Sequence, residues 1–108
     1  MRTILMDLDG VLNQYKGDYR PDFIPPIKEG AKDFVIRLSN DYEIKLFTTR
    51  PQKLATKWLI ENGLNTYIKN VTNTKISAFL YIDDRCIKFN GNYSKLYNEI
   101  ENFRVWYK

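Results

Sequence analysis

The feature that most constrains this chain is the short apolar segment near its start and the two acids that end it. Residues 4–6 are apolar and lead into Asp7, Leu8, Asp9 and Gly10. Such a run is typical of a buried parallel strand that ends in a turn. Strand geometry would place both carboxylates on one face, where they repel unless a cation such as Mg²⁺ lies between them. An Asp-Gly turn at a strand end is also common without a metal.

A second acid pair favours a metal site over an ordinary turn. Residues 78–82 form another apolar run, and Asp83 and Asp84 follow it directly. Two separate strands that both end in paired carboxylates are harder to explain as turn chemistry alone. We therefore treat all four acids as candidate metal ligands.

Length and composition indicate one domain over residues 1–108 with a modest core, since 44% of the residues are hydrophobic. No apolar run reaches the roughly 20 residues that span a bilayer, and acids stand where a signal peptide would need its cleavage site. A cytoplasmic protein without membrane contact is expected. Cys86 is the single cysteine, which excludes an internal disulfide and suits a reducing compartment.

The absence of histidine excludes Ser-His-Asp and Cys-His nucleophile systems and every zinc site that needs imidazole. Carboxylates, lysine or tyrosine must then perform any acid-base chemistry. The net charge of +4 suits an anionic ligand such as a phosphate ester or nucleic acid. A plain solvated basic surface is the commoner explanation of such an excess.

Strand and helix patterns alternate along the chain. After a loop over residues 13–26 we expect a helix over 27–40, a strand over 43–47, a helix over 51–62 and a weak strand over 65–71. Strands over 78–82 and 87–89 should follow. A C-terminal helix, with Asn92 or Ser94 as its N-cap, should then run to about residue 106. Trp58 is expected in the core, because it shares the helical spacing of its apolar neighbours.

This alternation predicts a three-layer, Rossmann-like α/β domain with a parallel sheet, helices on both faces and no cap domain. Right-handed crossovers place the second and third strands on one side of the first strand and the fourth strand on its other side. Ligands in such sheets bind where the strand order reverses. Asp7, Asp9, Asp83 and Asp84 would converge there. The connection before the fourth strand is short for a full crossover helix.

Four motifs, in this order, resemble those of the haloacid dehalogenase superfamily of phosphatases and phosphotransferases. They are Asp7-Leu8-Asp9-Gly10-Val11-Leu12, then Phe47-Thr48-Thr49-Arg50, then Lys75, then Tyr81-Ile82-Asp83-Asp84-Arg85. The resemblance covers most of the chain and implies a Mg²⁺-dependent phosphomonoester hydrolase.

By the family pattern, Asp7 is the nucleophile that forms an aspartyl-phosphate, and Asp9 is the general acid and base. The pattern also implies a metal held by Asp7, by the Asp9 backbone carbonyl and by Asp84 or Asp83. Thr48 and Lys75 would contact the phosphoryl group and complete the catalytic set. Among neighbouring residues, Thr49, Arg50 and Arg85 are candidate substrate contacts, although an arginine past a strand end is usually solvated or structural.

The missing cap implies an open site. The loop over residues 13–26 could serve as a lid, or a second copy of the chain could cover the site. Size and motif spelling are closest to small uncapped phosphatases, which suits a sugar phosphate or a phosphorylated macromolecule terminus. The Ile82-Asp83-Asp84-Arg85 ending also occurs in polynucleotide 3′-phosphatase domains, so a polynucleotide 3′-phosphatase or a nucleotidase is the alternative.

Two further readings belong to other functional classes. A phosphoacceptor signalling module also gathers aspartates, a threonine and a lysine. It places a lone acceptor aspartate on a middle strand, with threonine and then lysine after it, whereas in this chain an acid pair comes last. A non-catalytic module that binds phosphate or nucleic acid would keep the scaffold without turnover. The intact Asp7, Thr48, Lys75 and Asp84 positions favour the enzyme.

Overall fold

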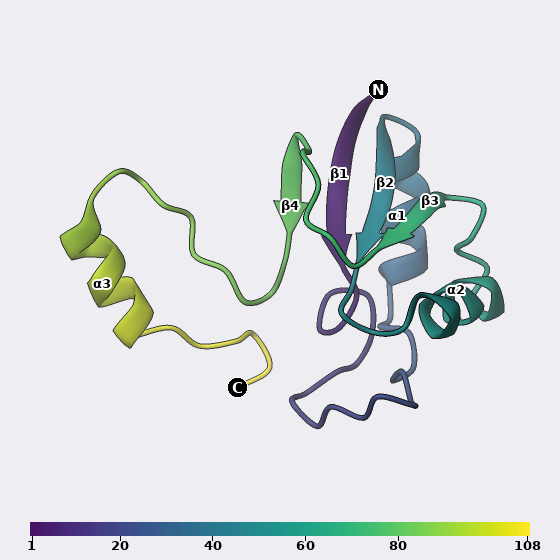
Figure 1. Ribbon diagram of the computed structural model, residues 1–108, viewed down its shortest axis with the longest axis horizontal. Helices are drawn as coiled ribbons and strands as arrows, with labels where there is room; N and C mark the ends of the chain where they lie inside the picture. Colours follow the sequence, from purple (N-terminus) through teal and green to yellow (C-terminus); the bar gives the residue numbers. More distant parts are fainter.

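The protein is described over residues 1–108 by a computed structural model (Figure 1). Its elements are β1 (Arg2–Asp7), α1 (Ala31–Ser39), β2 (Tyr42–Phe47), α2 (Gln52–Glu61), β3 (Ile68–Thr72), β4 (Leu80–Ile82) and α3 (Tyr93–Glu101). No helix here combines the length and the apolar character needed to cross a bilayer.

The four strands form one parallel sheet in the order β3-β2-β1-β4. This confirms the predicted α/β class, the strand order and the lack of a cap domain. In the register of the sheet, Met6 of β1 lies between Leu46 of β2 and Ile82 of β4. The strand that carries Asp7 is therefore central, and its carboxyl end lies beside that of β4.

The core lies between the sheet and the two helices α1 and α2. Met6, Ile44 and Leu46 point from the sheet into this layer and are fully buried, where they join Val35 of α1 and Trp58 of α2. Each such side chain stabilises the fold by roughly 1.5 to 3 kcal/mol relative to an exposed position. The prediction that Trp58 belongs to the core is confirmed.

Several elements differ from the sequence prediction, among them β3, which begins at Ile68 and not at residue 65. The first helix begins at Ala31 and not at Ile27, because Gly30 adopts a left-handed conformation (φ 85°) that interrupts helical geometry. Residues 87–89 form no strand, since they follow β4 away from the sheet and pair with no neighbour. The last helix ends at Glu101. Asn92 is its N-cap as expected, and its side chain accepts a hydrogen bond from the Lys95 backbone N–H.

The expected helix layer on the second face of the sheet is not formed. Figure 1 shows α1 and α2 close to the sheet and α3 standing well apart from it, beyond β4. None of the α3 residues is buried. The connection from β3 to β4 is too short to hold a covering helix, so this face carries only loop residues such as Lys75.

Candidate functional site

Three of the four predicted acids meet at the carboxyl ends of β1 and β4. Asp7 is the last residue of β1, and Asp83 and Asp84 follow β4. One carboxylate oxygen from each lies within 4.8 Å of the other two. The parallel pairing of β1 with β4 brings these tips together, as the sequence predicted.

The electrostatics of this acidic cluster favour a bound cation. Burial raises the pKa of Asp7 to about 8, and the nearby carboxylate of Asp83 adds to the effect. Burial also raises the pKa of Asp84, with Asp83 acting in the same direction. A positive charge among the three would remove the repulsion that opposes their ionisation.

The residues present fit a hard divalent cation such as Mg²⁺. Three carboxylates on two rigid strand ends supply the oxygen ligands that Mg²⁺ prefers. In addition, Oδ2 of Asp84 is buried and has no hydrogen-bond partner, although buried polar atoms are normally paired. Gly10 lies against the same carboxylate, because a Cβ added there would collide with Asp84 Oδ2. This orphaned oxygen is a natural metal ligand.

Lys75 lies on the same side of the sheet as Asp7. Both line a cavity of about 160 Å³ together with Asp83 and apolar residues that include Phe47 and Tyr81. The Lys75 ammonium stands 4.5 Å from the centre of the Tyr81 ring, a cation-π geometry. Lys75 therefore supplies the positive charge in the cavity that Asp7 and Asp83 line.

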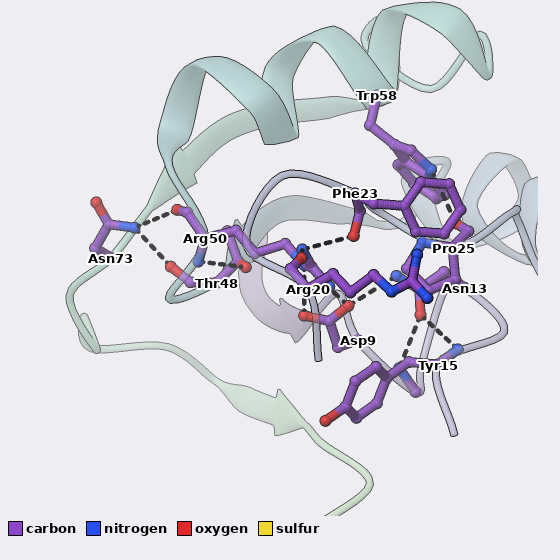
Figure 2. A network of polar contacts seen from close by, with 11 residues as sticks. Asp9, Asn13, Tyr15, Arg20, Phe23, Pro25, Thr48, Arg50, Trp58 and Asn73 are labelled. Atoms are coloured by element: carbon purple, nitrogen blue, oxygen red, sulfur yellow. Dashed lines mark hydrogen bonds and ion pairs between the residues drawn. The ribbon is translucent and has the colours of Figure 1, made fainter. Parts of the chain in front are cut away.

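Asp9 takes a different place from the one that its spacing predicted. Strand geometry ends at Asp7, and the Leu8 carbonyl already accepts turn hydrogen bonds from Val11 and Leu12. The alternation of side chains therefore stops before Asp9. Its carboxylate accepts two hydrogen bonds from Nε of Arg50, at 3.1 Å and 2.9 Å, as Figure 2 shows.

Arg50 is the centre of this second network. Its side chain is fully buried, and Nη1 donates to the backbone carbonyls of Arg20 (2.7 Å) and Phe23 (2.9 Å). The guanidinium also stands 4.7 Å from the centre of the Tyr19 ring. The expectation that Arg50 contacts a substrate is corrected, because no part of its side chain is accessible. Instead, its hydrogen bonds connect the loop over residues 13–26 to Asp9.

Asn13 completes the turn after β1 and was missed by the sequence analysis, which placed it in a featureless loop. It is fully buried. Its amide donates to Asp9, while its Oδ1 accepts from the backbone N–H groups of Gly10 and Tyr15. The only signal in the sequence is an amide residue three positions after the Asp-Gly turn, a pattern that many surface turns share.

Hydrogen bonds hold the segment after β2 in place. Thr48 is buried, and its hydroxyl oxygen accepts from the Arg50 backbone N–H. Asn73, a second residue that the sequence analysis missed, donates to the carbonyls of Thr48 and Arg50. Thr49 is exposed.

Arg85 lies beside the acidic cluster, at the surface of the protein. It is exposed and lines a groove beside α3, and its backbone N–H donates to Asp83 Oδ1. The structure therefore brings together Asp7, Asp83, Asp84 and Lys75. It separates Asp9 and Arg50 from them and leaves Thr49 and Arg85 at the surface.

The end of the chain returns to the turn after β1. Nε1 of Trp106 donates to the Gly10 carbonyl at 2.7 Å. Tyr107 packs edge-on against both Trp106 and Tyr15. These contacts support the turn that holds Gly10 against Asp84.

Comparisons with protein-family models and with curated proteins give no match. Among solved structures, the chain is similar to a conserved protein from Bacteroides thetaiotaomicron, with a TM-score of 0.60 and 20% sequence identity over 97% of this chain and 93% of that one. At this identity the likeness concerns the fold. The parallel α/β architecture is thus shared with a solved protein over nearly the whole chain.

Proposed function

We propose that this chain is a Mg²⁺-dependent phosphomonoester hydrolase that works through an aspartyl-phosphate on Asp7. The observation that carries the proposal is the grouping of Asp7, Asp83 and Asp84 at two strand ends, with Lys75 lining the cavity that Asp7 and Asp83 share. An anionic nucleophile, a cation site and an ammonium group in one place are what phosphoryl transfer requires. The order of motifs that resembles the haloacid dehalogenase superfamily supports the same activity.

In this proposal the Asp7 carboxylate attacks phosphorus, an aspartyl-phosphate bond forms, and the bond to the leaving oxygen breaks. Water then attacks the same phosphorus, which releases phosphate and restores Asp7. Asp7, Asp84 and Asp83 would hold Mg²⁺, together with the Asp9 carbonyl. When bound, the ion supplies positive charge that offsets the repulsion between the carboxylate and the incoming phosphate.

The other residues have supporting roles. The Lys75 ammonium neutralises charge on the phosphoryl oxygens. Thr48 already uses its hydroxyl oxygen as an acceptor, which leaves the hydroxyl proton for a phosphoryl oxygen. Asp9 is proposed as the general acid and base. Because its carboxylate is paired with Arg50, that role requires it to leave the ion pair and turn toward the leaving oxygen.

The test is hydrolysis of p-nitrophenyl phosphate with and without Mg²⁺. We expect Mg²⁺-dependent turnover that Asp7→Asn reduces by about 10⁴-fold or more, as for removal of a nucleophile that acts with its neighbours. Asp33→Asn on the exposed side of α1 removes the same charge away from the site and is the matched control. Equal rates for Asp7→Asn and the parent would overturn the proposal.

The substrate class is proposed to be a sugar phosphate or the phosphorylated end of a macromolecule. The net charge of +4 favours keeping 3′-phosphorylated oligonucleotides and nucleotides in the same screen. Salt-sensitive retention of single-stranded DNA without phosphate release would instead indicate a binding module. A long-lived phosphorylated form after treatment with acetyl phosphate would indicate a phosphoacceptor module.

A further inference from the structure

The last part of the chain has no buried residue. Every residue after Ile68 is exposed or half-exposed, although this part includes β4 and α3. The Cα radius of gyration is 14.7 Å, against about 13 Å for a compact domain of about 100 residues. Figure 1 shows the reason, because α3 projects away from the sheet.

This projection leaves two unpartnered apolar surfaces on one chain. The first lies on β4 and the uncovered face of the sheet, and the second lies on α3 and the segment before it. Together they comprise Phe79, Tyr81, Phe89, Tyr93, Tyr97 and Ile100, each more than 40% exposed. Single exposed apolar residues are ordinary, but this many in one region mark an interaction surface.

The area matches the requirement of a protein dimer. A fully exposed aromatic side chain presents about 200 Å², so we obtain about 650 Å² for these six side chains at their observed exposures. A standard stable interface takes about 800 Å² from each partner. Because a two-fold exchange buries both surfaces of each chain, their combined area is close to what a specific association needs.

The charges of the two surfaces are complementary. Within α3, Glu99 and Glu101 outnumber Lys95, although the whole chain is basic. On the β4 side, the Arg2 guanidinium lies 4.2 Å from the Phe79 ring centre and the Lys75 ammonium lies 4.5 Å from that of Tyr81. The acidic end of α3 therefore matches these two cations on the β4 side, while Asp83 and Asp84 make the carboxyl end of β4 acidic.

We propose that α3 of one copy packs against β4 and the uncovered sheet face of a second copy, and that the second copy does the same in return. Since each chain carries both surfaces, the exchange is self-complementary and closes as a two-fold dimer. The α3 segment is held at both ends, because Asp84 packs on Gly10 and Trp106 bonds to the Gly10 carbonyl. The α3 segment can therefore contact a partner while these contacts with its own chain stay intact.

The dimer would also complete the candidate site. The cavity that Asp7 and Lys75 line lies on the uncovered face of the sheet. A helix from the partner would form the wall that this chain does not supply. Association itself is independent of the proposed hydrolase activity, so either can fail without the other.

The experiment is sedimentation equilibrium of the full chain, which has a mass of 12.9 kDa, over a range of micromolar concentrations. We expect twice the monomer mass for the parent. Ile100→Glu adds a charge to the exposed apolar side of α3 and should raise the dimer Kd by about 30-fold or more, the effect of a hot-spot residue. Asn98→Glu adds the same charge on the opposite side of α3 and should leave the Kd within about threefold.

Tyr81→Glu on β4 tests the receiving surface in the same way. Because Ile100 and Tyr81 are about half exposed, these variants should fold, and far-ultraviolet circular dichroism checks that they do. A parent that sediments as a monomer would overturn the proposal. A dimer that Ile100→Glu and Asn98→Glu weaken equally, or that Tyr81→Glu leaves intact, would overturn it as well.

Discussion

Replacing Arg50 by methionine tests whether the Asp9 network stabilises the fold. Methionine keeps an unbranched apolar side chain in the buried position but removes every donor of the guanidinium. The Asp9 carboxylate would keep only the hydrogen bond from Asn13, and the carbonyls of Arg20 and Phe23 would lose theirs. A partly buried carboxylate without its cation is strongly unfavourable.

The size of the effect follows from the exposure of the two partners. The Arg50 side chain is 0% exposed and that of Asp9 is 18% exposed. Removing one partner of a buried pair costs about 3 to 5 kcal/mol, and we expect the lower end because Asp9 is partly hydrated. The buried Nη2 of Arg50, which has no partner, disappears with the guanidinium and offsets part of the loss. A loss of about 3 kcal/mol lowers Tm by roughly 12 to 20 °C.

The assay is urea unfolding of the parent, Arg50→Met, Asp9→Asn and the double variant. The resulting cycle should give a coupling energy of about 2 kcal/mol between Arg50 and Asp9, the contribution of a charge-assisted hydrogen bond. Arg20→Met is the matched control. Its side chain is 65% exposed and its Nε lies 3.8 Å from Asp18, so its removal should change the free energy of unfolding by less than about 0.5 kcal/mol. A coupling energy near zero would refute our reading of the network.

Three further predictions concern the acidic cluster and its support. Because burial raises the pKa of Asp7 to about 8, Mg²⁺ must displace a proton from Asp7 below that pH. The affinity of the protein for Mg²⁺ should therefore rise about tenfold per pH unit from about pH 5 to 8 and then level off. Titration calorimetry in buffers of different ionisation enthalpy measures both this affinity and the released proton. Gly10→Ala should lower the stability and weaken the Mg²⁺-induced rise in Tm, because Gly10 has φ +83° and an added Cβ would meet Asp84. Gly91 has a similar φ of +95° but open space around it, so Gly91→Ala should show only the backbone cost of about 1 to 2 kcal/mol. Trp106→Phe, which removes the donor to the Gly10 carbonyl, should cost about 1 kcal/mol in urea unfolding. A flat pH dependence, equal glycine variants or a neutral Trp106→Phe would contradict the respective argument.

The sheet and the acidic cluster could be predicted because they depend on local patterns. Apolar runs that end in acids mark β1 and β4, and the crossover rule then fixes their adjacency. The convergence of Asp7, Asp83 and Asp84 follows from that adjacency alone. Strand pairing needs no knowledge of individual side-chain contacts.

The Arg50 network could not be predicted, because its partners are main-chain carbonyls of a loop without periodicity. Which carbonyl faces the guanidinium depends on how residues 13–26 fold, and the sequence holds no repeating signal for that. Asn13 and Asn73 raise the same difficulty, since both use side-chain amides to satisfy backbone groups of irregular segments. The position of α3 was also missed, because amphipathic periodicity shows that a face must be covered but not by which chain.

The separation of Asp9 from Asp7 has a physical consequence for the acidic cluster. Two carboxylates two residues apart would share one face only if the strand continued, and it ends at Asp7. Arg50 binds Asp9, and among the three carboxylates that raise the pKa of Asp7 the effect of Asp9 is the smallest. Arg50 connects Asp9 to the carbonyls of Arg20 and Phe23, so release of Asp9 breaks this connection. Movement of the acid and movement of the loop over residues 13–26 are therefore coupled through one guanidinium.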